Sequence, residues 1–162
     1  MEPKYLFGID PGTRCGWAVH DGERVVTSGV WDLKPQRHEG AGMRYVRLRG
    51  YLNILVGAFK PRLIVYEEVR RHAGTSAAHI YGGITGALQE YGEDVGIPYT
   101  ALPVGSIKKR ATGKGNASKQ MMVDSARSEL GRDPADDNEA DAMWIAQFGA
   151  EMYPVKVLGV EP

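Results

Sequence analysis

The sequence predicts a mixed α/β fold in which helices flank a single five-stranded sheet. Two observations predict this class. Three short β-prone segments separated by turn signals open the chain, and short apolar strands then alternate with segments whose apolar residues recur at helical spacing. The expected element order is βββαβαβαα. With 162 residues, 43% of them hydrophobic, the chain has the size of one compact domain, 1–162.

The first three strands are expected to form a meander. Tyr5–Ile9 is apolar and β-prone, and Asp10-Pro11-Gly12 directly after it is a strong turn signal. Gly16–His20 and Arg24–Ser28 flank Asp21-Gly22, a dipeptide that closes tight hairpins because it tolerates positive φ. The chain therefore opens with three sequential strands.

Helices and strands alternate through the middle of the chain. Apolar residues at helical spacing predict a helix over Met43–Phe59, and Leu63–Tyr66 then has the composition of a buried strand that ends at Glu67. A second helical stripe occupies 76–91. The short strand Tyr99–Leu102 follows it and completes the five expected strands.

The last part of the chain predicts two more helices. Helical spacing indicates one over 118–130. Asp136, with Glu139 three residues later, matches a capping box that opens a final helix. A basic, glycine-containing stretch lies between the fifth strand and these helices, and no further element is predicted there.

Opposite charges gather in two separate stretches. The formal net charge is +0, because 20 Lys and Arg residues balance 20 Asp and Glu residues. The basic cluster is Lys108, Lys109, Arg110, Lys114 and Lys119; the acidic cluster is Asp133, Asp136, Asp137, Glu139 and Asp141. Carboxylates that hold metal beside a separate basic surface for phosphate would also sum to about zero.

Cysteine usage and hydropathy indicate the compartment. Cys15 is the single cysteine, so no internal disulfide can form, and no charged segment followed by a long apolar run opens the chain. No stretch approaches the roughly 20 apolar residues that a membrane span needs. We therefore expect a soluble protein in a reducing cytoplasm, in a bacterium or a phage-infected cell, with no membrane partner.

Three acids occupy positions where ordinary surface carboxylates are uncommon. Asp10 and Glu67 each follow an apolar strand, and Asp141 falls about one turn into the last helix. Such carboxylates lose hydration and repel one another unless a cation or hydrogen-bond donors compensate them, and Mg²⁺ is suited because it takes oxygen ligands. Each acid alone has an ordinary alternative: a turn at Asp10, an ion pair of Glu67 with Arg62 or Arg70, and a surface position at Asp141.

The segments around these acids resemble a known set of motifs. Phe7–Thr13, Val65–Val69 and Glu139–Ala146 are similar, in the same order, to the three acidic motifs of RuvC-type Holliday-junction resolvases. The similarity extends from Tyr5 to about Phe148. It implies a ribonuclease H-like fold with the same βββαβαβαα order, and a metal-dependent endonuclease.

The resemblance also implies a ligand set. Asp10, Glu67 and Asp141 would hold two Mg²⁺ ions, one activating water and the other stabilising the leaving oxygen, with Mn²⁺ as a possible substitute. Three residues before Asp141, where the family usually has aspartate or histidine, this sequence has Asn138, preceded by Asp137. Both positions lie near Asp141 on a helix. Register favours Asn138 as the fourth ligand, and Asp137 stays its competitor.

Part of the basic stretch matches the same family. Lys108, Lys119 and the intervening 113–118 resemble the family's lysines and flexible loop near the scissile phosphate. A lysine there stabilises charge that develops in the transition state, so we predict a catalytic role for Lys119. Composition alone would favour a solvated basic loop. A nucleotide P-loop is excluded at Gly113-Lys114, because Gly115 replaces the required Ser or Thr, and no nucleotide cofactor is expected.

Basic residues in two places are expected to contact DNA. The predicted set is Lys108, Lys109, Arg110, Lys114, Lys119, Arg70 and Arg71. A guanidinium shortly after Glu67 can bind phosphate or stack on a base, and a solvated arginine is the alternative. Phosphate contacts make the expected affinity fall steeply with salt.

The helix predicted over 76–91 has two possible roles. Its apolar stripe includes Ile80, Ile84 and Leu88, and three nearby glycines permit close backbone approach. In related resolvases the corresponding helix helps form a homodimer, which suits a roughly two-fold symmetric junction that is cut twice. We predict that these three residues lie at the dimer interface. Core packing within the monomer is the alternative.

These inferences predict an enzyme that binds branched DNA. The expected reaction is resolution of four-way junctions by paired symmetric nicks that leave 5′-phosphate and 3′-hydroxyl ends. One alternative is a less selective nuclease of the same fold that cuts flaps, other branched DNA or RNA in hybrids. Another is a junction-binding protein without catalysis, to which Asn138 in place of an acid would point.

Overall fold

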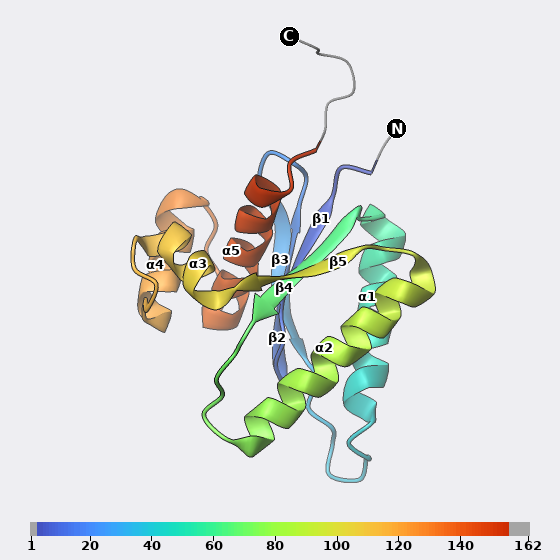
Figure 1. Cartoon of the computed structure of the whole chain (residues 1–162). Coiled ribbons are helices and arrows are strands. Elements are labelled where there is room, and N and C mark those ends of the chain that lie inside the picture. Colours follow the sequence, from blue (N-terminus) through green and yellow to red (C-terminus); the bar gives the residue numbers. More distant parts are fainter. Residues whose placement is uncertain (1–2, 156–162) are drawn as a thin grey trace.

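The computed structural model describes residues 3–155 as a five-stranded sheet with helices on both faces (Figure 1). The elements are β1 (Leu6–Asp10), β2 (Arg14–His20), β3 (Val25–Asp32), α1 (Met43–Phe59), β4 (Leu63–Glu68), α2 (Thr75–Val95), β5 (Tyr99–Pro103), α3 (Val104–Thr112), α4 (Lys119–Glu129) and α5 (Asp137–Met152). The strand order is β3-β2-β1-β4-β5. The β1–β2 and β2–β3 pairs are antiparallel and the β1–β4 and β4–β5 pairs are parallel, which confirms the predicted mixed sheet. Within residues 3–155 no helix is long and apolar enough to span a membrane.

Different helices cover the two faces of the sheet (Figure 1). On one face α1 and α2 pack over a buried cluster that includes Phe7, Ile9, Ile64 and Tyr66. On the other face α5 runs across the strands, with α3 and α4 packed against it. Successive residues of a strand point to opposite faces of the sheet. The residue between Phe7 and Ile9, and the residue between Ile64 and Tyr66, therefore face α5.

Glycines allow α5 to lie directly on the sheet. A Cβ atom at Gly8 of β1 would stand 2.5 Å from the backbone nitrogen of Ala146. A Cβ atom at Gly16 of β2 would collide with the backbone carbonyl of Asn138. A larger residue at either position would therefore push α5 away from the strands.

The predicted cap of α5 is confirmed. The Asp136 carboxylate accepts a hydrogen bond from the Glu139 backbone N–H at 3.0 Å. The Glu139 carboxylate reaches back to the Ala135 N–H at 2.7 Å and accepts a second bond from the Ser28 hydroxyl of β3, also at 2.7 Å. The first bond satisfies an N–H group of the first turn, and the other two hold the start of α5 against the preceding residue and the sheet.

The basic stretch contains a helix that the sequence reasoning did not predict. Helix α3 begins before the basic stretch 108–119 and includes its first residues. The described chain therefore has three helices after β5. Ile107 and Ala111 bury one side of α3, and Gly113 ends it in the left-handed conformation at φ 80°. The abundance of lysine and glycine concealed this short apolar stripe.

The predicted interface role of the α2 stripe is wrong for two of its three residues. Ile84 and Leu88 are completely buried against the sheet within the monomer, and Ile80 is partly buried beside them. Ile84 and Leu88 therefore have no surface for a second subunit, and the predicted role of Ile80 stays a prediction. On the solvent side of α2, Gly82 and Gly86 have open space where a Cβ atom would lie.

Candidate active site

Three acids meet where β1 and β4 end against α5. Ile9 of β1 pairs with Tyr66 of β4, which brings the following residues, Asp10 and Glu67, side by side. Gly8 contacts α5, and strand alternation points Asp10 to the same face. The Val65 side chain likewise contacts α5 at Gly149, so Glu67 points there too.

The electrostatics of these side chains confirm that they are neighbours. Burial raises the pKa of Asp10 well above its usual value, and the charges of Asp141 and Glu67 raise it further. Burial together with the charges of Glu67 and Asp137 raises the pKa of Asp141 to about 7. Burial also raises the pKa of Glu67, which Lys108 partly offsets. The fold therefore concentrates negative charge in one half-buried place.

A cleft opens beside these acids. Its volume is about 340 Å³, and its polar lining includes Glu67, Asp141, Lys108, Lys119 and Arg71. The Lys119 ammonium lies 3.1 Å from the carboxylate of Asp137. Acids and lysines thus line the same cleft, a combination that can hold a cation and a phosphate together.

The apolar part of this cleft escaped the sequence reasoning. Val69, Val104 and Met122 complete its lining. Only Val104 carried a signal, because it starts the helical spacing that continues through Ile107 and Ala111 of α3. Val69 belongs to the motif around Glu67 but was given no role, and nothing near Met122 in the sequence marks it as a neighbour of the acids, because α4 and the segment after β4 meet only in the folded chain.

The donor set fits a hard divalent cation. Oδ1 of Asp141 is buried and, within residues 3–155, has no hydrogen-bond partner, which is costly for a carboxylate oxygen. The acids grouped with it offer carboxylate oxygens, the donor type that Mg²⁺ and Mn²⁺ prefer, whereas structural zinc sites use mainly cysteine and histidine. In the conformations described for residues 3–155, no three His, Cys, Asp or Glu side chains converge tightly enough to enclose an ion, so binding one requires side-chain rotation.

Asp137 and Asn138 lie in different environments. The Asp137 charge contributes to the raised pKa values of both Asp10 and Asp141. The Asn138 amide instead donates to Asp136 Oδ2 at 3.4 Å, and the Asn138 backbone packs on β2. Of the two residues that register leaves open, Asp137 is the one grouped with the acids.

The predicted DNA-binding residues separate into two groups. Arg70, Arg71, Lys109, Lys114 and Lys119 are exposed. Lys108 is partly buried and lines the cleft.

Arg110 does not belong with them. Its guanidinium donates twice to Glu151, both bonds at 2.8 Å, approaches Glu129 at 3.5 Å and lies over the Trp144 ring. In the protein without DNA, Arg110 thus helps to pack α3 against α5, and its predicted DNA contact stays a prediction.

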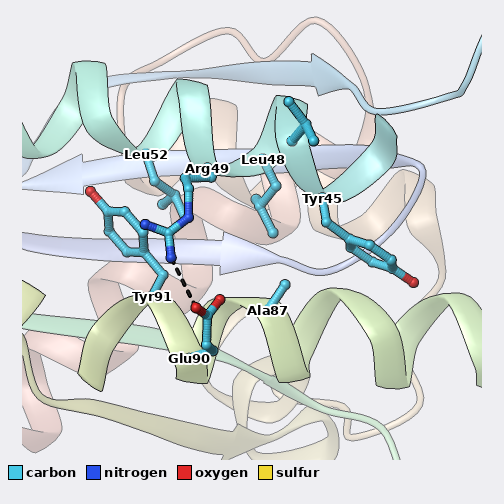
Figure 2. A pocket seen from close by; sticks show the side chains of 8 residues that line it. Tyr45, Leu48, Arg49, Leu52, Ala87, Glu90 and Tyr91 are labelled. Atoms are coloured by element: carbon cyan, nitrogen blue, oxygen red, sulfur yellow. Dashed lines mark hydrogen bonds and ion pairs between the residues drawn. The ribbon is translucent and has the colours of Figure 1, made fainter. Parts of the chain in front are cut away.

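A second hollow, of about 180 Å³, lies between α1 and α2 on the other face of the sheet (Figure 2). Arg49 extends across it over the Tyr91 ring. Glu90 and Asp94 neutralise this arginine at 3.0 and 2.9 Å. No acid of the active-site group lines this hollow, so it is separate from the catalytic cleft.

Curated relatives match most of the chain. A RuvC crossover junction endodeoxyribonuclease from Magnetococcus marinus is 30% identical over 174 aligned positions, which cover 99% of this chain and 95% of the relative. The chain belongs to the RuvC family. Another RuvC, from Anaeromyxobacter dehalogenans, is 34% identical over 146 positions, covering 87% of this chain and 77% of the relative. No sequence model of a protein family matches the chain.

Solved RuvC structures share the fold. RuvC of Thermus thermophilus in complex with a Holliday junction substrate superposes with a TM-score of 0.77 at 27% identity, covering 92% of this chain and 96% of that one. The yeast mitochondrial resolvase Ydc2, at 18% identity and a TM-score of 0.61, shows the fold alone. The predicted RuvC-type, ribonuclease H-like fold is confirmed.

Proposed function

We propose that this RuvC-family chain acts as a single nuclease domain that resolves four-way DNA junctions by paired symmetric nicks, leaving 5′-phosphate and 3′-hydroxyl ends. The observation that carries the proposal is the grouping of Asp10 with Glu67 and Asp141, two acids that line one cleft together with Lys108 and Lys119. The Thermus thermophilus relative, whose structure holds a Holliday junction substrate, supports the choice of substrate.

The side chains of the cleft have complementary roles in this proposal. Asp10, Glu67 and Asp141 would hold Mg²⁺, which when bound supplies activation of water and stabilisation of the leaving oxygen. Lys119 binds a phosphate oxygen and stabilises its developing negative charge. Its present partner, Asp137, neutralises this lysine until DNA arrives.

We assign the fourth ligand position to Asp137 rather than to Asn138. The Asp137 carboxylate contributes to the raised pKa values of both Asp10 and Asp141, whereas the Asn138 amide is bonded to Asp136. A charged oxygen is also a stronger ligand for Mg²⁺ than a neutral amide oxygen.

We further propose a homodimer, because paired cuts in a roughly two-fold symmetric junction need two related active sites. The solvent side of α2 supports this proposal. Gly82 and Gly86 leave open space there, and close helix approach would be possible. Light scattering of the purified protein, with and without a Gly86→Leu substitution, tests whether this face forms the dimer.

The first experiment compares a labelled four-way junction with a matching linear duplex, a flap and an RNA–DNA hybrid, each with Mg²⁺ or EDTA. Paired, metal-dependent nicks confined to the junction support the proposal. Comparable cleavage of flaps or hybrids favours the less selective nuclease. Tight junction binding with no product in Mg²⁺ or Mn²⁺ favours a binding protein without catalysis.

A further inference from the structure

One tyrosine of α2 ties down the chain on both sides of the β4 terminus. The Tyr81 hydroxyl donates to the backbone carbonyl of Glu67 at 2.8 Å and accepts from the backbone N–H of Val69 at 3.2 Å. Its ring packs against His72 with centroids 4.9 Å apart. A single hydroxyl therefore bridges the two residues that flank Glu68.

This bridge holds a segment that has little other support. Residues 69–73 join β4 to α2, and within the described chain they make no backbone–backbone hydrogen bond outside helices and strands. The segment begins at Val69 and includes Arg71, and both line the acid cleft. Loss of the hydroxyl would leave the Val69 N–H without its partner and free the backbone next to Glu67.

We propose that Tyr81 is a positioning residue for the nuclease reaction. Its hydroxyl fixes the Glu67 carboxylate and the start of the cleft-lining segment relative to α2. Within residues 3–155 the Tyr81 hydroxyl bonds only to backbone atoms, so it acts through Glu67 and Val69. The inference depends on the proposed function, because the positioned carboxylate belongs to the proposed metal ligands.

The test substitutes Tyr81→Phe, which removes the hydroxyl and keeps the ring that packs on His72. Tyr91→Phe is the matched control, because it removes a hydroxyl from the same helix that bonds only to the Asn53 side chain of α1, at 2.9 Å. A displaced catalytic group slows the chemical step, so we expect kcat for junction cleavage to fall about ten- to a hundredfold. The junction Kd measured in EDTA should stay at the wild-type value.

A second readout needs neither DNA nor metal. Hydrogen exchange of the Val69 amide, measured by NMR, should become faster in Tyr81→Phe and stay unchanged in Tyr91→Phe. Wild-type kcat or unchanged Val69 exchange in Tyr81→Phe would overturn the positioning role. If the wild-type protein itself fails to cut the junction, the proposed function falls and this role falls with it.

Discussion

The two ends of α5 carry acids in opposite situations. Near its start, burial and neighbouring acids raise the pKa of Asp141 to about 7, and Oδ1 of this residue has no hydrogen-bond partner in the described chain. Near its end, burial also acts on Glu151, but hydrogen bonds from Arg110 and Gln147 outweigh it and lower the pKa of this acid.

This difference separates acids that stabilise the fold from acids that serve chemistry. Arg110 and Gln147 compensate the charge of Glu151 within the protein, so this acid needs no bound ligand. Asp141 is compensated only in part by Lys108 and Lys119, because burial and the charges of Glu67 and Asp137 outweigh the two lysines. An uncompensated acid group is costly in stability and is typical of functional sites.

The largest expected effect is on catalysis, and it comes from removing one charge of the acid group near the start of α5. Asp10→Asn should reduce junction cleavage on the order of a thousandfold, because it removes a charged ligand from the acid group. Single-turnover cleavage with Mg²⁺ measures the effect, and Glu151→Gln serves as an acid-to-amide control on the same protein. Full activity of Asp10→Asn would contradict the site assignment.

A smaller effect is expected at the start of α5. Asp137→Asn should lower cleavage about ten- to a hundredfold, less than Asp10→Asn, because the new amide still offers the metal a neutral oxygen. Asn138→Ala should retain most activity, because its side chain bonds only to Asp136 among the described residues. The same single-turnover assay over a Mg²⁺ titration compares the two. A greater loss in Asn138→Ala would return the fourth ligand position to Asn138.

The acid group should also destabilise the protein when divalent ions are removed. Asp141→Asn in EDTA at pH 8 should raise the free energy of unfolding by about 1–2 kcal/mol, allowing for solvent screening. The folded-state pKa of about 7 lies above the usual value, so folding of the wild type weakens as pH rises through 7. Urea unfolding at pH 8 and pH 5 should therefore show the gain at pH 8 and a smaller one at pH 5.

The opposite end of α5 should respond in the opposite sense. Glu151→Gln should lower the free energy of unfolding by about 1 kcal/mol, because it weakens a partly exposed bidentate ion pair with Arg110. Junction cleavage at a temperature where the variant is folded should stay at the wild-type rate. Increased stability of Glu151→Gln would show that this pair does not compensate the charge.

The smallest effect is a pH dependence near the same end. His20 accepts a hydrogen bond from the Gly22 N–H at Nδ1, so Nε2 carries the proton and donates to Gln147 Oε1 at 3.1 Å. Burial lowers the pKa of His20, so the folded protein resists its protonation and loses stability as pH falls below about 6.5. Urea unfolding at pH 7.5 and pH 5.5 measures how much stability each protein loses over this range. The wild type should lose more than His20→Asn, by less than about 1 kcal/mol. An equal pH dependence in both proteins would assign it to other groups.

The sequence was sufficient for features that follow from local pattern. Asp10 and Glu67 could be placed at strand ends from the sequence, because an apolar run followed by an acid is a local signal. The spacing of Asp136 and Glu139 predicted the helix cap. The order of the strands along the chain followed from the alternation of strand and helix periodicities. Helical spacing likewise placed Asp141 on the last helix.

Other features depend on contacts that no local pattern encodes. The ion pair of Arg110 with Glu151 was not predicted, because the two residues are 41 positions apart in the sequence. Arg110 was therefore grouped only with the residues expected to bind DNA. Ile84 and Leu88 were assigned to an interface because an apolar stripe looks the same whether it faces the sheet or a partner. The choice between Asp137 and Asn138 depends on one residue of helix rotation, which the packing on Gly16 sets.

The three acids come from segments that are far apart along the chain and belong to β1, β4 and α5. The first two meet when the parallel strands pair, and the third arrives only when the final helix has packed over Gly8 and Gly16. During synthesis, a chain that has not yet released α5 from the ribosome therefore has no assembled cleft. The proposed cutting of DNA therefore needs a long-range contact of the final described helix, and a copy in which this contact has not formed has no assembled site.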